Sequence, residues 1–220
     1  MDGKKGRFIT IEGGDGVGKS SVVEGLSQAI VKGLGVELIK THEPGGTPSA
    51  QAIRQLFMSP PENDPLHPRS ELFLVSAARA QHVEAKIRPS LAQGKWVISD
   101  RFYDSTRVYQ GVLAGVGMRD IDQVINYSVA GCHPDLTLLL DCDTSIVMER
   151  LQHRAEMMAH SVSDRFDSAG KVFQEKLRSA FLGLAAADKQ RIVVIDTSGN
   201  ISDIVKQAFE VIKTRLAYPS

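Results

Sequence analysis

A glycine-rich segment near the start of the chain constrains its fold more than any other feature. The segment reads Gly13-Gly14-Asp15-Gly16-Val17-Gly18-Lys19-Ser20 and fits the pattern G-x-x-x-x-G-K-[ST]. The apolar run from Phe8 to Ile11 before it predicts a strand, and apolar residues at helical spacing after it predict a helix. Between a strand and a helix, this pattern predicts a loop that binds phosphate through its backbone N–H groups and the positive end of the helix.

The side chains of this loop extend the prediction from phosphate to a nucleoside triphosphate. A lysine at position 19 reaches the β- and γ-phosphates in such loops, and a hydroxyl at position 20 binds Mg²⁺. We therefore expect ATP and Mg²⁺ to bind here. The residues expected at the ATP phosphates are Gly13, Gly14, Asp15, Gly16, Val17, Gly18, Lys19, Ser20 and Ser21.

Composition narrows the class of protein and of partner. The 220 residues fit a single domain, 1–220. Lys and Arg number 26, as do Asp and Glu, so the net charge of zero argues against a nucleic-acid partner. No apolar run reaches the length of a membrane span, and no signal-type segment opens the chain, so we expect a cytoplasmic protein. The two cysteines, Cys132 and Cys142, have no metal-ligand spacing and are expected to be free.

Five short apolar runs are expected to form buried strands. They do not alternate between apolar and polar residues, which is typical of a parallel sheet covered on both faces. These runs are 7–12, 36–41, 96–100, 136–141 and 192–196.

Helical patterns fill the gaps between these runs. The expected helices are 19–32, 49–58, 70–93, 105–113, 118–130, 144–152, 170–187 and 202–216. Strands that alternate with helices predict a doubly wound α/β fold, that of P-loop nucleoside triphosphatases, with a five-stranded parallel sheet. Residues 154–168 are polar and poorly patterned, and we expect them to form a mobile lid.

Ligands of such a fold gather at the carboxyl ends of the strands. Asp100 and Arg101 end one expected strand, and an arginine there can bind a phosphate through two parallel hydrogen bonds. Arg79, on an expected helix, offers a second such group. Two arginines beside a triphosphate loop predict a second, phosphorylated substrate. Ser105 to Gly111 follows with hydroxyls, an amide and an aromatic ring, groups suited to a nucleobase.

At this point the chain resembles the thymidylate kinase family, whose members phosphorylate dTMP with ATP. The resemblance rests on Glu12 to Ser20, Glu43-Pro44-Gly45-Gly46-Thr47, Asp100-Arg101-Phe102 and Ser105 to Gly111, in that order. Pro134 to Asp141 and Asp164-Arg165-Phe166-Asp167 also fit, so the resemblance spans nearly the whole chain.

The resemblance implies roles for individual residues. Lys19, Arg101, Arg154 and Asp15 would be catalytic, with Arg154 as the lid arginine because Gly16 stands where some members carry a P-loop arginine. Arg79 and Arg101 would hold the monophosphate, and Arg150 would lie against the adenine. The implied dTMP site comprises Asp15, Glu43, Arg79, Arg101, Ser105, Thr106, Tyr109 and Gln110. Asp15 would join Ser20 at the metal, and the chain would be a homodimer.

The chain departs from the family pattern at three places. His42 stands where the family commonly has arginine. Val75 occupies the place of the aromatic residue that stacks on the base, and the nearby Phe73 is expected on the wrong helix face. The expected lid, between Arg154 and Asp164, is short of arginines.

Two other functions compete with dTMP phosphorylation. The first is a P-loop kinase for another nucleotide or a nucleoside, in which Glu43 or Asp100 would act as a base for a 5′-hydroxyl. The second is a switch or motor ATPase, for which the acceptor-site residues would have no purpose. An acceptor profile with ATP and Mg²⁺ distinguishes all three.

Overall fold

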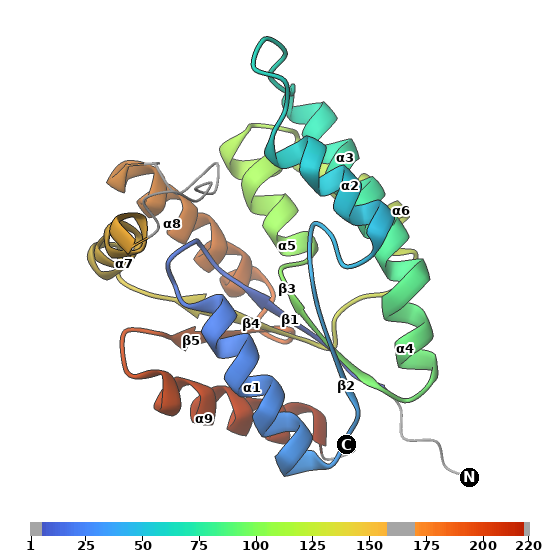
Figure 1. Ribbon diagram of the computed structural model, residues 1–220, viewed down its shortest axis with the longest axis vertical. Coiled ribbons are helices and arrows are strands. Elements are labelled where there is room, and N and C mark those ends of the chain that lie inside the picture. Colours follow the sequence, from blue (N-terminus) through green and yellow to red (C-terminus); the bar gives the residue numbers. More distant parts are fainter. Residues whose placement is uncertain (1–5, 158–169, 218–220) are drawn as a thin grey trace.

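The computed structural model describes residues 6–157 and 170–217, and its centre is one parallel sheet (Figure 1). Within the described residues, five strands lie in the order β2-β3-β1-β4-β5. They are β1 (Phe8–Glu12), β2 (Leu38–His42), β3 (Trp96–Asp100), β4 (Leu136–Asp141) and β5 (Ile192–Asp196). The predicted α/β fold and all five strands are confirmed, although β2 begins two residues later than the predicted 36.

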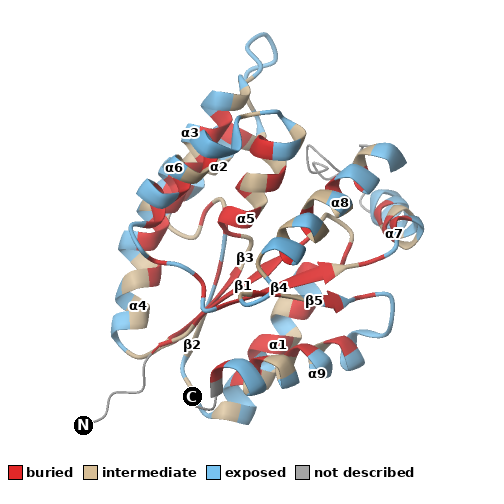
Figure 2. Cartoon of the chain, turned by 180° about the vertical axis from the view of Figure 1, so that it is seen from behind, coloured by how far each residue is buried: buried red, intermediate tan, exposed pale blue. Residues whose placement is uncertain are grey.

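The three inner strands of the sheet are buried on both faces, as their apolar sequences predict, whereas the edge strands β2 and β5 are partly exposed (Figure 2). Along β1, Ile9 and Ile11 pack into the core that includes α1 (Lys19–Leu34) and α9 (Ile201–Ile212). Phe8, which directly precedes Ile9, points the other way and packs into a second core on the opposite face. Each strand therefore supplies apolar side chains to two helical layers.

The second layer contains five helices of the described residues, and two of them carry expected acceptor residues, Arg79 on one and Ser105 and Thr106 on the other. The five helices are α3 (Pro68–His82), α4 (Arg88–Ala92), α5 (Tyr103–Thr106), α6 (Met118–Val129) and α8 (Lys171–Ala187). The remaining helices are α2 (Pro48–Met58), which packs along α3, and α7 (Thr144–Met157). Among the described residues, no helix is long and apolar enough to cross a membrane.

Two predicted helices are divided by π-helical turns. The predicted helix 70–93 forms α3, a turn η1 (Val83–Ile87) and α4, which has a proline, Pro89, in its first turn. Proline has no N–H to donate, so the regular i→i−4 hydrogen bonding is interrupted at this point. The predicted helix 105–113 forms α5 and a turn η2 (Arg107–Leu113), and a third turn, η3 (Lys213–Ala217), extends α9.

The expected lid 154–168 begins inside α7, which runs through Met157. Its remaining residues lie outside the described part of the chain. The single-domain prediction and the lid therefore stay predictions.

Candidate active site

The phosphate loop joins β1 to α1 at the carboxyl edge of the sheet. Gly13, Gly16 and Gly18 have φ values of 140°, 80° and 93°, which side chains rarely allow. A Cβ atom at Gly13 would also lie 2.6 Å from the backbone oxygen of Leu140. The loop conformation therefore requires glycine, and it presents the first turn of α1 to a ligand.

Lys19 lies folded against this loop. Its Nζ donates to the backbone oxygen of Gly14 at 2.6 Å and lies 3.4 Å from Oδ1 of Asp15. Burial lowers the pKa of Lys19, and Arg101 adds to this effect, whereas Asp15 and Asp100 oppose it. An anion at the loop would give Lys19 a second negatively charged partner beside Asp15.

A cleft of about 450 Å³ lies above the loop, and most of the residues predicted to bind ATP line it. Arg150 lies in its wall and donates to the backbone oxygen of Thr197 at 2.8 Å. We call this cleft the donor cleft. Of the predicted residues, it is lined by Asp15, Gly16, Gly18, Lys19, Ser20, Ser21, Arg150 and Arg154. Gly13, Gly14 and Val17 line a smaller cavity beside the end of β4 instead.

A second, smaller cleft of about 90 Å³ adjoins the first. We call it the acceptor cleft. All eight residues implied for dTMP line it, namely Asp15, Glu43, Arg79, Arg101, Ser105, Thr106, Tyr109 and Gln110. The donor and acceptor clefts share Asp15, Glu43, Arg54 and Arg101, so their contents meet at these residues.

Arg101 connects the phosphate loop to the acceptor cleft. Its guanidinium donates to the backbone oxygen of Gly13 at 2.9 Å, to Ser105 Oγ at 3.0 Å and to Asp15 Oδ1 at 2.6 Å. Burial alone would raise the pKa of Asp15, but Arg101 and Lys19 outweigh it and hold that pKa well below its usual range. Asp15 is therefore ionised and fixes Arg101 where the two clefts meet.

The backbone of Arg101 is held in the left-handed region, with φ at 68°. A buried carboxylate, Glu12, holds the turn that follows. Its Oε1 accepts from the backbone N–H groups of Phe102 and Ser105, and its Oε2 accepts from Ser105 Oγ at 2.7 Å. Sequence reasoning gave Glu12 no role, although a glutamate that ends a buried apolar strand is a usable signal.

Arg79 reaches the acceptor cleft from α3 and is almost fully buried. Its Nε donates to Glu43 Oε2 at 2.8 Å and its Nη2 to Thr106 Oγ1 at 2.9 Å, while its Nη1 has no partner among the described residues. The other carboxylate oxygen of Glu43 lies 3.0 Å from Nδ1 of the buried His82. Glu43 is thus a support for Arg79, and Arg79 keeps one donor for a ligand.

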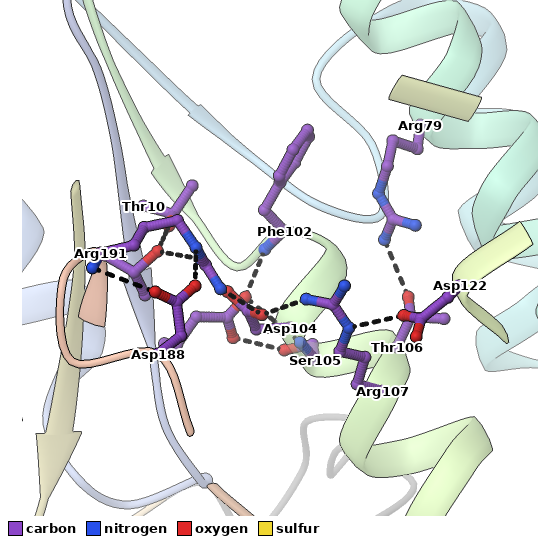
Figure 3. Close-up of polar contacts among 12 residues, drawn as sticks. Thr10, Arg79, Phe102, Asp104, Ser105, Thr106, Arg107, Asp122, Asp188 and Arg191 are labelled. Carbon is purple, nitrogen blue, oxygen red and sulfur yellow. Dashed lines mark hydrogen bonds and ion pairs between the residues drawn. The ribbon is translucent and has the colours of Figure 1, made fainter. Parts of the chain in front are cut away.

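A buried ion network holds α5 from behind (Figure 3). Asp104 accepts from Arg107 at 3.0 Å and from Arg191 at 2.6 Å, and Arg191 also donates to Thr137 on β4. Figure 3 shows Asp104 between the two arginines, on the helix that carries Ser105 and Thr106. The network ties this helix to the sheet, so the polar groups facing the acceptor cleft are fixed.

Some residues of the clefts were either missed by sequence reasoning or given no role at the metal. Arg54 on α2 lines both clefts and donates to the backbone oxygen of Pro44 at 3.1 Å. Phe57, one turn further on, forms an apolar wall of the acceptor cleft. Asp100 lines the donor cleft with a buried Oδ1 that has no partner among the described residues. Its position at a strand end was recognised, but the orphaned oxygen follows only from packing.

This orphaned oxygen is a test of whether the site suits Mg²⁺. Mg²⁺ binds few protein oxygens, typically one or two carboxylates beside substrate phosphates. Ser20 and Asp100 both line the donor cleft, so the donor set fits the ion. Asp15 is less suited than Asp100, because its Oδ1 is already engaged by Arg101 and Lys19.

Val75 stands where the family pattern has the aromatic residue that stacks on the base, and the structure shows which residues line the cleft in its place. Val75 is buried and lines the acceptor cleft, where the family pattern has an aromatic ring. Phe73 is 62% exposed and points away, as its position on the helix predicts. The aromatic rings of the cleft come instead from Phe57, Phe102 and Tyr109.

Comparisons with known proteins agree with this geometry. The family model described as thymidylate kinase matches residues 11–208. The chain belongs to the thymidylate kinase family. It is 40% identical to a thymidylate kinase of Marinomonas sp. over 94% of this chain and 93% of the relative. It is also 40% identical to one of Chromohalobacter salexigens over 96% and 97%.

Structural comparison leads to the same family. A crystal structure of the thymidylate kinase from Ehrlichia chaffeensis superposes with a TM-score of 0.75 at 30% identity, covering 94% of this chain and 99% of that one. The resemblance inferred from the motifs is therefore confirmed, and so is the P-loop fold. The roles of individual residues stay predictions.

Proposed function

We propose that this protein transfers the γ-phosphoryl group of ATP to dTMP and releases dTDP and ADP. One observation carries the proposal: the donor and acceptor clefts meet at Asp15 and Arg101, so a phosphate held in one faces a phosphate held in the other. Membership of the thymidylate kinase family supports the same reaction.

The proposed reaction needs positioning and charge more than proton transfer. An oxygen of the dTMP phosphate bonds to the γ-phosphorus of ATP, and the bond from that phosphorus to the bridging oxygen of ADP breaks. Lys19 and Arg154 stabilise the charge that develops, while Arg101 aligns the attacking phosphate. The attacking phosphate is already largely ionised near neutral pH, so no general base is required.

We assign the substrate contacts as follows. Ser20 and Asp100 would hold Mg²⁺, which would neutralise charge on the triphosphate, and Asp15 stays a weaker candidate. Arg150 lies against the adenine, Arg101 and Arg79 hold the dTMP monophosphate, and residues of α5 and η2 border its thymine and deoxyribose. Those bordering residues are Ser105, Thr106, Tyr109 and Gln110.

We also propose a cytoplasmic homodimer whose lid spans residues 154–168. Exposed large apolar side chains on α3, η2 and α6 support self-association; they are Phe73, Val112, Met118 and Tyr127. The described cysteines, Cys132 and Cys142, are buried and free, which agrees with a reducing compartment. Light scattering after gel filtration distinguishes a dimer from a monomer.

An acceptor profile tests the reaction. With ATP and Mg²⁺, dTMP is expected to be the best acceptor among dTMP, dUMP, dCMP and thymidine. The uracil nucleotide lacks only the 5-methyl group, and we expect kcat/KM to fall roughly tenfold to a few hundredfold. For dCMP we expect a larger loss, because its N4 amino group is a donor where thymine has an acceptor. Equal use of dCMP, or ATP hydrolysis indifferent to any acceptor, contradicts the proposal.

A further inference from the structure

Gln110 faces the acceptor cleft and is held from behind by a buried carboxylate. Its Nε2 donates to Glu71 Oε2 at 3.2 Å, and both residues are at most 5% exposed. Gln110 belongs to η2 and lines the cleft, whereas Glu71 stands in the first turn of α3 and is not part of the lining. The contact therefore joins two elements and acts on the cleft only through Gln110.

The carboxylate fixes which end of the Gln110 amide turns toward it. An amide side chain carries an acceptor oxygen and a donor NH₂ group, and an ionised carboxylate only accepts hydrogen bonds. In the structure, the NH₂ group faces Glu71. The Oε1 of Gln110 accepts no hydrogen bond from any described residue, and it is not among their sealed, unpartnered atoms, so it opens on the cleft.

We infer that Glu71 is a positioning residue for base specificity, because it holds the oxygen of Gln110 toward the Watson–Crick edge of the acceptor base. This inference rests on the proposed function and deepens it. Thymine and uracil carry a hydrogen on N3, and the N3–H group donates a hydrogen bond to the Gln110 oxygen. Neutral cytosine has a bare, accepting N3, which would face this oxygen with no hydrogen between them.

A free amide would not discriminate in this way. Without the carboxylate, the Gln110 side chain can rotate by half a turn and present its NH₂ group, which pairs with the N3 of cytosine. Rejection of dCMP therefore depends on the contact between Glu71 and Gln110. The contact between Glu71 and Gln110 does not involve the 5-methyl group of thymine. Its loss should therefore leave the preference for dTMP over dUMP unchanged.

Glu71→Gln tests the inference, since it keeps the shape of the side chain and removes the obligatory acceptor. We expect the ratio of kcat/KM for dCMP to that for dTMP to rise by about tenfold or more. The reason is that Gln110 could then turn its NH₂ group to the N3 of cytosine, which removes the unfavourable contact between two acceptors. The ratio of dUMP to dTMP and the KM for ATP should stay near wild type. Glu84→Gln, whose side chain is 59% exposed and lies outside both clefts, is the matched control.

A purely structural role predicts a different result. Loss of packing would lower kcat/KM for every acceptor alike and leave the ratio of dCMP to dTMP unchanged, which overturns the inference. Gln110→Leu is the second variant, and it covers the case in which Glu71→Gln does not fold. It removes both the oxygen and the NH₂ group of the amide and should lose the same discrimination. Glu71→Gln in that background should add nothing. Retained rejection of dCMP by Gln110→Leu also overturns the inference.

The wild-type acceptor profile separates the two levels of the argument. If the wild-type protein phosphorylates none of these nucleotides, the proposed function fails. If it prefers dTMP and rejects dCMP, but Glu71→Gln rejects dCMP equally, only the role of Glu71 fails.

Discussion

Replacing Arg101 by alanine is the sharpest perturbation of the proposed mechanism. The substitution removes hydrogen bonds to Gly13, Ser105 and Asp15 together with the charge at the junction of the clefts. It also leaves Asp15 buried beside Lys19 alone, so the pKa of Asp15 should rise from its depressed position. Acceptor phosphate and Asp15 would then meet without the cation that separates their charges.

The expected loss follows from the burial of this ion pair. The side chains of Arg101 and Asp15 are 16% and 13% exposed, so solvent screens them little. Truncating one partner of a buried, hydrogen-bonded charge pair costs about 2–5 kcal/mol. That range corresponds to a fall in kcat/KM for dTMP of roughly 30-fold to 5,000-fold. Binding of ATP should suffer far less, because Lys19 and the loop backbone remain.

Steady-state formation of dTDP and ADP, measured with each substrate varied in turn, gives kcat and the KM for each substrate. Arg101→Lys keeps the charge but not the planar fork of donors, so its activity should lie between wild type and Arg101→Ala. Arg119→Ala removes an exposed arginine from α6 and should behave as wild type. An unchanged kcat and KM for dTMP in Arg101→Ala would remove this residue from the acceptor site.

Three other changes probe the remaining parts of the site. Lys19→Ala should abolish phosphoryl transfer without unfolding the chain, because it removes the charge at the β- and γ-phosphates; substantial retained activity, measured beside a thermal melt, would refute the donor assignment. Arg154→Ala should lower kcat by about 10³-fold with little change in either KM, as for an arginine that acts in the transition state. A near wild-type Arg154→Ala beside an inactive Arg165→Ala would move the lid assignment. Burial, with a contribution from Asp104, raises the pKa of Glu12 to about 7 from 4.5, so the folded state holds a proton that the unfolded chain releases. Stability from this group is full below pH 4.5 and is lost as the pH rises through 7, so Glu12→Gln should flatten that loss in denaturant titrations; an equal slope in both proteins would contradict it.

The fold and the edge of the sheet at which the clefts lie could be predicted from the sequence because their signals are local, whereas most members of the acceptor cleft were implied by the family resemblance. Each strand is a short run that must be apolar on both sides, and Ile9 and Phe8 enter opposite cores as this requires. Parallel strands also bring their carboxyl ends to one edge, which gathers the loop after β1 and the Arg101 turn after β3. Strand ends therefore predicted neighbours without any knowledge of packing.

The supports behind those residues could not be predicted, because they depend on pairing between distant elements. His82 and Glu43 meet across 39 positions, and Glu12 and Ser105 across 93. Nothing in the local pattern of either partner specifies the other. The resemblance implied a place for Glu43 in the acceptor site, and Glu43 does line that cleft, but its contacts with Arg79 and His82 could not be predicted from the sequence.

These supports explain how a chain with no net charge presents two buried cations to a substrate. A buried guanidinium without a partner is costly, and a fully paired one has no donor left for a ligand. Arg79 meets both conditions, because Glu43 neutralises its charge while Nη1 stays unpaired among the described residues. Arg101 is paired with Asp15, yet it stands where the donor and acceptor clefts meet. The carboxylates thus hold each arginine in a ligand-ready position before a phosphate arrives, so substrate binding need not include the cost of ordering these side chains.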